Sequence, residues 1–279
     1  MQAGELPRLF FLERSDFVLQ LCTLASGSSG NSLLVSDGAT HILVDAGISC
    51  RRITTALKGL GVDPASLSAV LITHEHTDHI SGLTTLTKQR KVPVYASRGT
   101  GRQLCYRIAF LEEVLHPFTP GECFSIGSID IETFPTPHDA AESTGYALSA
   151  GGRKAAVVTD LGHVTEAVEA GIRGANLLVA EANHDVEWLR SGPYPYFLKD
   201  RILGDRGHLS NEAGAALVCS AVSAGASAVV LAHLSHENNT PERARQVVGD
   251  SLTRMGAVPG RDVLLDVAPR SEPGRRYTV

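Results

Sequence analysis

The chain has 279 residues, of which 43% are hydrophobic and 20% are charged, a composition ordinary for a soluble globular enzyme. A net charge of −5 excludes a general polyanion binder, so any nucleic-acid contact must come from a local basic patch. The sequence has neither a membrane-spanning apolar run nor a secretory signal pattern, which predicts a cytoplasmic protein. Five scattered cysteines favour reduced thiols over a disulfide framework.

The first half of the chain alternates predicted strands with predicted helices. Residues 1–15 are expected to form a loose lead-in to the first strand. A glycine-rich loop at residues 26–31 either cradles a phosphate, with Ser28 and Asn31 as contacts, or is a plain hairpin turn. Apolar periodicity predicts strands at residues 17–24, 32–35, 41–45, 67–72 and 92–96, and helices at 49–60, 83–89 and 104–115.

The second half repeats this alternation without an intervening linker, so residues 1–279 are expected to form a single domain. Short helices are expected within residues 188–203, where Pro193 and Pro195 interrupt the pattern, and Ser210 is expected to cap another helix. The remaining predicted helices are 165–170 and 241–255, and the predicted strands are two within 122–134, then 145–148, 155–159, 177–180, 226–232 and a last one at 263–267.

The most unusual stretch is Thr73-His74-Glu75-His76-Thr77-Asp78-His79, which follows a predicted buried strand and precedes a predicted helix. On extended backbone His74 and His76 point to the same side, Asp78 continues that alternation, and His79 turns to the other side. Imidazole and carboxylate groups are common metal ligands. The loop can therefore offer two ligands to one metal ion and two to a second ion nearby.

Other polar residues of this kind also follow predicted strands, namely His138, Asp160, Glu181 and His233. Side chains at the ends of neighbouring strands gather on one rim of a layered sheet structure, where α/β sites form. The pattern therefore favours an α/β fold with two packed sheets covered by helices, a four-layer αββα sandwich.

The spacing His74-x-His76-x-Asp78-His79, followed by His138, Asp160 and His233, resembles the metallo-β-lactamase superfamily over residues 17–267. Residues 25–32, 181–185, 207–211 and 233–239 resemble its WalJ/YycJ branch in particular. The resemblance implies the four-layer metallo-β-lactamase sandwich. It also implies a binuclear metal-dependent phosphodiesterase that acts on nucleic acid, with 5′-to-3′ DNA exonuclease activity.

The resemblance also implies which residues hold two divalent ions, Zn²⁺ or Mn²⁺. One ion is expected on His74, His76 and His138, the other on Asp78, His79 and His233, with Asp160 bridging both. Such an ion pair activates a hydroxide as the nucleophile. His236 is an alternative to His233 as the ligand, and is otherwise expected near the substrate or at the surface.

Glu181 and His208 resemble the Glu–His pair of ribonuclease Z, in which the histidine protonates the leaving oxygen. The resemblance therefore implies Asp78, Glu181 and His208 as catalytic residues. The alternative interpretation is a helix-cap environment for His208 and an ordinary strand-end carboxylate for Glu181.

Substrate contacts are expected from a basic, aromatic segment that contains Tyr194, Tyr196, Lys199, Arg201 and Arg206, unless that segment is merely a solvated pair of helices. His184 is either a phosphate contact or part of a solvated loop. DNA is favoured over RNA, because the long tRNA-binding arm of ribonuclease Z relatives is missing. The short separation of Asp160 from His233 also leaves no room for the inserted domain of larger nucleases.

A second hypothesis is a small-molecule metallo-hydrolase of the same fold, acting on a thioester, a lactone or a cyclic phosphodiester. The acidic pI of about 6.1 favours it. A non-catalytic binding module would be expected to have an incomplete ligand set, whereas all seven expected ligands are present.

Overall fold

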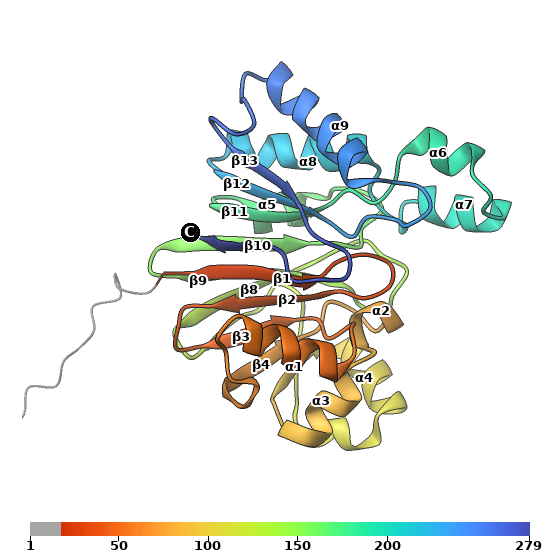
Figure 1. Cartoon of the computed structure of the whole chain (residues 1–279). Helices are drawn as coiled ribbons and strands as arrows, with labels where there is room; N and C mark the ends of the chain where they lie inside the picture. Colours follow the sequence, from red (N-terminus) through yellow and green to blue (C-terminus); the bar gives the residue numbers. More distant parts are fainter. Residues whose placement is uncertain (1–17) are drawn as a thin grey trace, which may run out of the picture.

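The computed structural model describes residues 18–279, and the lead-in expected at residues 1–15 lies outside this range. Two seven-stranded sheets lie face to face, with helices on their outer sides (Figure 1). This arrangement confirms the predicted four-layer αββα sandwich. Within residues 18–279, no helix is both long and apolar enough to cross a membrane.

The first sheet has the strand order β14-β1-β2-β3-β4-β5-β6. Its antiparallel strands are β14 (Arg276–Thr278), β1 (Gln20–Ala25), β2 (Ser32–Ser36) and β3 (His41–Val44). The parallel strands that continue from β3 are β4 (Leu67–Leu71), β5 (Val94–Ser97) and β6 (Leu115–Phe118). The C-terminal strand β14 thus returns to the sheet that the N-terminal half builds.

The second sheet has the order β13-β12-β11-β10-β9-β8-β7. Its antiparallel part consists of β7 (Cys123–Ile126), β8 (Ile129–Pro135), β9 (Thr144–Ala150) and β10 (Arg153–Val158). Its parallel part continues with β11 (Leu177–Glu181), β12 (Ala228–Ala232) and β13 (Leu264–Val267). Strands β11 and β12 are buried throughout, as parallel strands covered on both faces must be.

Helices cover the outer face of each sheet (Figure 1). Those on the first sheet are α1 (Cys50–Gly59), α2 (Thr77–Ile80), α3 (Leu83–Arg90) and α4 (Arg98–Arg107). Those on the second are α5 (Glu166–Ile172), α8 (Asn211–Ser223) and α9 (Pro241–Arg254). Two further helices, α6 (Val186–Ser191) and α7 (Tyr196–Leu203), project to one side of the sandwich.

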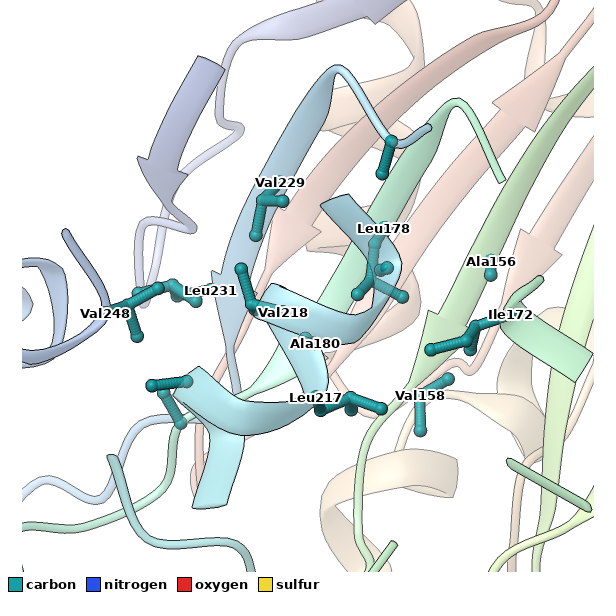
Figure 2. Packing of buried hydrophobic residues seen from close by; sticks show 14 of the residues in the cluster. Ala156, Val158, Ile172, Leu178, Ala180, Leu217, Val218, Val229, Leu231 and Val248 are labelled. Carbon is teal, nitrogen blue, oxygen red and sulfur yellow. The ribbon is translucent and has the colours of Figure 1, made fainter. Parts of the chain in front are cut away.

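Apolar side chains fill the space between the two sheets and the space under the outer helices. Figure 2 shows the second sheet's outer layer, where side chains of β11 and β12 pack against α5, α8 and α9. The strands contribute Leu178 and Val229, and the helices contribute Leu217, Val218 and Val248. Fully burying one such side chain stabilises the fold by about 1.5–3 kcal/mol. This packing fixes the strands whose ends carry the polar residues described below.

Two predictions of secondary structure were wrong, one at residues 104–115 and one at the C-terminal end of the chain. The predicted helix at 104–115 ends at Arg107, a 3-10 turn (Ala109–Glu113) follows, and Leu115 begins β6. Leu104, Ile108 and Leu111 are all buried, so helix and turn together satisfy the apolar spacing that suggested one helix. The strand predicted as last is followed by β14, whose three residues are too few to show a periodicity.

Candidate metal centre

The loop between β4 and α2 carries four potential metal ligands. His74 and His79 are fully buried, whereas His76 and Asp78 lie at the surface of the rim with partly exposed side chains. His76 is the extended N-cap residue directly before α2, so the chain changes from extended to helical within the ligand stretch. The predicted strand-to-helix loop therefore holds its ligands at different depths.

The second sheet brings one residue from each of several strand ends to the same place. His138 follows β8, Asp160 follows β10, Glu181 ends β11 and His233 follows β12. Four overlapping groups have their ligand atoms within 4.8 Å of one another: His74, His76 and His138; His74, His79 and Asp160; Asp78, His79 and His233; and Asp160, Glu181, His208 and His233. The structure thus gathers all seven expected ligands in one cluster, here called the metal cluster.

Three residues at strand ends adopt left-handed backbone conformations, with φ values of 62° at Asp45, 62° at Asp160 and 55° at His233. Such values are uncommon outside glycine, and aspartate and histidine are among the residues that tolerate them. Their cost is on the order of 1–3 kcal/mol each, and they persist where surrounding structure enforces them. Here the turns follow β3, β10 and β12, and all three side chains meet at the metal cluster.

Asp45 is a functional candidate that sequence reasoning missed. One of its carboxylate oxygens accepts a hydrogen bond from His79 Nδ1 at 2.7 Å, and the other accepts one from the backbone N–H of Thr73 at 2.9 Å. A histidine that donates from Nδ1 presents Nε2 as the free ligand atom. In the sequence, Asp45 could have been noticed by its position at the end of a predicted strand, a position that it shares with Asp160.

Two buried polar atoms of the cluster, His74 Nε2 and Asp160 Oδ2, have no hydrogen-bond partner among residues 18–279. An unsatisfied buried polar atom costs about 1–3 kcal/mol, so such atoms require an explanation. A bound cation satisfies both at once, and imidazole nitrogens with carboxylate oxygens are donors that Zn²⁺ and Mn²⁺ accept. The residues present therefore fit a dinuclear metal site.

The charges of the cluster also favour a bound cation. Burial lowers the pKa of His233, but the carboxylates of Asp160, Asp78 and Glu181 outweigh it and raise the pKa to about 10. The pKa of His79 is likewise raised, because Asp160 and Asp45 outweigh the effect of its burial. Buried carboxylates thus hold positive charge on two histidines, and binding of a divalent ion would displace those protons.

Glu181 is fully buried and joins two histidines. Its Oε1 lies 2.9 Å from His208 Nδ1 and 2.9 Å from His233 Nδ1, and its Oε2 accepts a hydrogen bond from the Leu209 N–H. Burial would raise the pKa of Glu181, but the charge and hydrogen bonds of His208 and His233 hold it below its usual range. The helix-cap alternative for His208 is not what the contacts show, because Ser210 caps α8.

A cavity of about 240 Å³ opens onto the metal cluster. Its walls include the cluster residues His76, Asp78, Asp160 and His233, together with His208. On the other side it is bounded by Tyr194, which precedes α7, and by residues of α7 itself: Leu198, Arg201 and Ile202. His208 is therefore placed where its Nε2 can face a bound molecule while Nδ1 stays on Glu181.

Three of the expected substrate contacts, Ser28, Asn31 and His184, lie in different surroundings. Ser28 lines the cavity. Asn31 is buried, and its side chain pairs with Gly27 in both directions and lies 3.1 Å from His79 Nε2. His184 is only 1% exposed, so its side chain belongs to the interior and not to a solvated loop.

Two of the expected basic contacts, Lys199 and Arg206, are engaged with the protein. Lys199 Nζ donates to the Arg190 carbonyl, and Arg206 donates to the carbonyls of His138 and Ala140. His236 has an exposed side chain beside Glu237, whereas His233 lies in the metal cluster. The geometry thus favours His233 over His236 as a ligand.

A second residue that sequence reasoning missed is Asp139. Its Oδ1 lies 3.3 Å from His138 Nε2, and its Oδ2 pairs with the Arg201 guanidinium of α7. Arg201 is 62 positions away in the sequence, so no local pattern could have indicated this pair.

The Beta-lactamase superfamily domain family matches residues 40–234 of the chain. The chain is 39% identical to Exodeoxyribonuclease YycJ of Bacillus anthracis, over 85% of this chain and 90% of that protein. It is 37% identical to Exodeoxyribonuclease WalJ of Streptococcus pneumoniae, over 91% of this chain and 96% of that protein. Ribonuclease Z of Mycobacterium bovis is 27% identical over 51% of this chain and 63% of its own length.

Two solved structures share the fold over nearly the whole chain. The metallo-beta-lactamase fold protein YhfI from Bacillus subtilis has a TM-score of 0.68 and 16% identity, covering 94% of this chain and 100% of that one. The short form of human tRNase Z has a TM-score of 0.63 and 17% identity, covering 92% and 98%. The chain belongs to the metallo-β-lactamase superfamily and is a metal-dependent hydrolase, as its histidine and aspartate spacing predicted.

Proposed function

We propose that the chain is a binuclear phosphodiesterase that removes nucleotides from DNA in the 5′-to-3′ direction. The observation that carries this proposal is the Glu181–His208 pair at the cavity, with 2.9 Å between Oε1 and Nδ1. The alkoxide that leaves a phosphodiester needs a proton, and a positioned histidine can supply it. The exodeoxyribonuclease names of relatives that match 85% and 91% of the chain support the choice of DNA.

His74, His76 and His138 would hold one ion, and Asp78, His79 and His233 the other. Asp160 would bridge them, because its Oδ1 lies 4.0 Å from Nε2 of His138, a ligand of the first ion, and its Oδ2 lies 3.4 Å from Nε2 of His79, a ligand of the second. Zn²⁺ and Mn²⁺ suit these nitrogen and oxygen donors. When bound, the ion pair supplies a nucleophile at neutral pH and stabilises the charge that develops on the phosphate.

In this proposal Glu181 is a positioning residue for two rings. Its contact with His208 Nδ1 fixes that ring with Nε2 toward the cavity, where Nε2–H donates a proton to the leaving oxygen. Its contact with His233 Nδ1 leaves His233 Nε2 as the ligand atom, 3.4 Å from Asp78 Oδ2. Asp78 acts in catalysis by placing the second ion.

We further propose Ser28 as a phosphate contact, since it lines the cavity. Arg206 would act indirectly, because it holds the backbone carbonyl of the ligand His138. Lys199 does not line the cavity, and would contribute its charge to a phosphate of the strand outside it, from its place on the Arg190 carbonyl.

The competing proposal is a small-molecule hydrolase for thioesters, lactones or cyclic phosphodiesters, which a cavity of about 240 Å³ also admits. A thiolate leaves readily without protonation, so a thioesterase has little need of His208. The metal-loaded protein should therefore be assayed in parallel on end-labelled DNA and on a thioester and a lactone. We expect DNA hydrolysis; turnover of the small esters with intact DNA would support the competing proposal.

A further inference from the structure

The segment 186–203, which contains α6 and α7 and is here called the arm, projects to one side of the sandwich (Figure 1). One side of α7 lines the cavity that opens onto the metal cluster. Every residue of α7 is at least partly exposed, and two aromatic rings stand out in solvent: Tyr196 is 79% exposed and Phe197 is 74% exposed. Large apolar side chains that stay exposed together often mark a binding surface. Neither the metal ligands nor the Glu181–His208 pair accounts for these rings.

The arm is fixed to the metal cluster by polar contacts. Arg201 of α7 pairs with Asp139, whose other oxygen lies 3.3 Å from the expected ligand His138. Lys199 Nζ donates to the Arg190 carbonyl at 2.7 Å and so ties α7 to α6. The Arg201–Asp139 pair therefore connects α7, which carries Phe197, to the metal cluster.

The two exposed rings lie on different sides of α7. Leu198, Arg201 and Ile202 share the side that lines the cavity. Phe197 precedes Arg201 by four positions, so the two side chains are neighbours on the helix surface. At about 100° per residue, Tyr196 lies on the side opposite the cavity and does not line it, so the substrate contact that the sequence suggested for this ring is not proposed. Tyr194, just before the helix, lines the cavity itself.

We propose that Tyr194 and Phe197 stack against the bases of a single-stranded DNA end whose terminal phosphodiester lies at the metals. This inference rests on the proposed exonuclease activity. Stacking on aromatic rings tolerates any base, as an exonuclease that advances along DNA requires, and only unpaired bases expose the face that stacks. A chain of net charge −5 gains little from overall attraction to DNA, so stacking supplies affinity that charge does not.

The test compares Phe197→Ala and Tyr194→Ala with Tyr196→Ala, a matched control that removes an equally exposed ring from the opposite side of the helix. Each protein, loaded with metal, is assayed on a single-stranded oligonucleotide and on one of equal length whose end nucleotides lack bases. We expect Phe197→Ala and Tyr194→Ala to lower kcat/KM on the intact strand by about 10-fold or more, mainly through KM. On the abasic strand neither variant should differ from the wild type, and Tyr196→Ala should stay within about twofold on both.

Several results would overturn this inference. Equal losses on the intact and abasic strands would mean that the ring supports the arm and does not stack on bases. An unchanged Phe197→Ala, or a Tyr196→Ala loss as large as that of Phe197→Ala, would assign the exposed rings to another occupant, such as a protein. If the wild type cleaves intact and abasic strands equally well, the stacking inference is contradicted but the proposed function is not. If the wild type cleaves no DNA, the proposed function itself is contradicted.

Discussion

The two sheets supply the metal cluster in different ways. The first sheet contributes four expected ligands from one loop, His74 to His79, whereas the second contributes one residue from each of several strand ends. The contiguous set is visible as a spacing in the sequence. The dispersed set was noticed in the sequence only through its positions after predicted strands, and the resemblance to a known family was needed to assign His138, Asp160 and His233 as ligands.

The two halves also differ in how a ligand is held in place. Asp45 in the first half orients one ligand, His79, whereas Glu181 in the second half contacts both the ligand His233 and the proposed acid His208. A change at Glu181 would therefore combine metal binding with proton transfer. Substitutions at His208 and Asp45 can separate the two functions, because His208 is not a proposed ligand and Asp45 does not contact the proposed acid.

The largest effect is expected at Asp160, where the two halves meet. Asp160→Ala removes the carboxylate placed between both ions, so activity on DNA should fall by at least about 10³-fold, equivalent to about 4 kcal/mol. Circular dichroism should show an intact fold, and elemental analysis should show fewer than the two ions per chain expected of the wild type. Retained turnover would show that the bridge is another residue.

The next largest effect is expected at His208, which belongs to the second half alone and is not a proposed ligand. His208→Ala should lower DNA hydrolysis by roughly 10²–10⁴-fold, the usual size of general-acid catalysis. A nitrophenyl phosphodiester has a leaving group that needs little protonation, so the loss should largely disappear on that substrate. An equal loss on both substrates would assign His208 to phosphate binding, and loss of metal would assign it to the ligand set.

The third prediction concerns His184, an interior residue of the second half. Burial lowers its pKa to about 4, although the charge of Glu181 opposes this. Between about pH 6.5 and pH 4 the unfolded chain binds a proton at this position that the folded chain does not, so stability falls as the pH falls. The full loss is about 3 kcal/mol.

His184→Gln removes that titration, so its unfolding free energy should depend less on pH across the same window. Urea unfolding of metal-free wild type and variant at pH 7 and pH 4.5 measures the difference without a contribution from acid-driven metal release. Parallel pH profiles for the two proteins would contradict the prediction.

The smallest effect is expected at Asp45, which supports a single ligand of the first half. Asp45→Asn weakens the hydrogen bond to His79 Nδ1, so metal affinity or activity should fall by about 10–100-fold. Asp37→Asn is a matched control, since Asp37 holds the turn at the opposite end of β3. A similar metal affinity in both variants would show that Asp45 has no orienting role.

The sequence predicted the sandwich and the histidine loop because both depend on local patterns, short apolar runs in strands and ligand types at short spacing. Asp45 and Asp139 were missed because their roles arise from contacts with His79 and Arg201, at 34 and 62 positions along the chain. The helix expected up to Leu115 failed because a 3-10 turn satisfies the same spacing. His184 follows Glu181 closely in the sequence, which suggested a place near the substrate, but its pairing with Ser210 lies in the interior.

The central proposal is exonucleolytic hydrolysis from the 5′ end of DNA at the metal cluster. It is tested most directly by incubating the metal-loaded protein with one DNA strand labelled at the 5′ end and with the same strand labelled at the 3′ end. We predict that the 5′ label appears at once in mononucleotides, while the 3′ label remains on fragments that shorten progressively. Release of the 3′ label first would contradict the direction, and intact DNA with either label would contradict the proposed function.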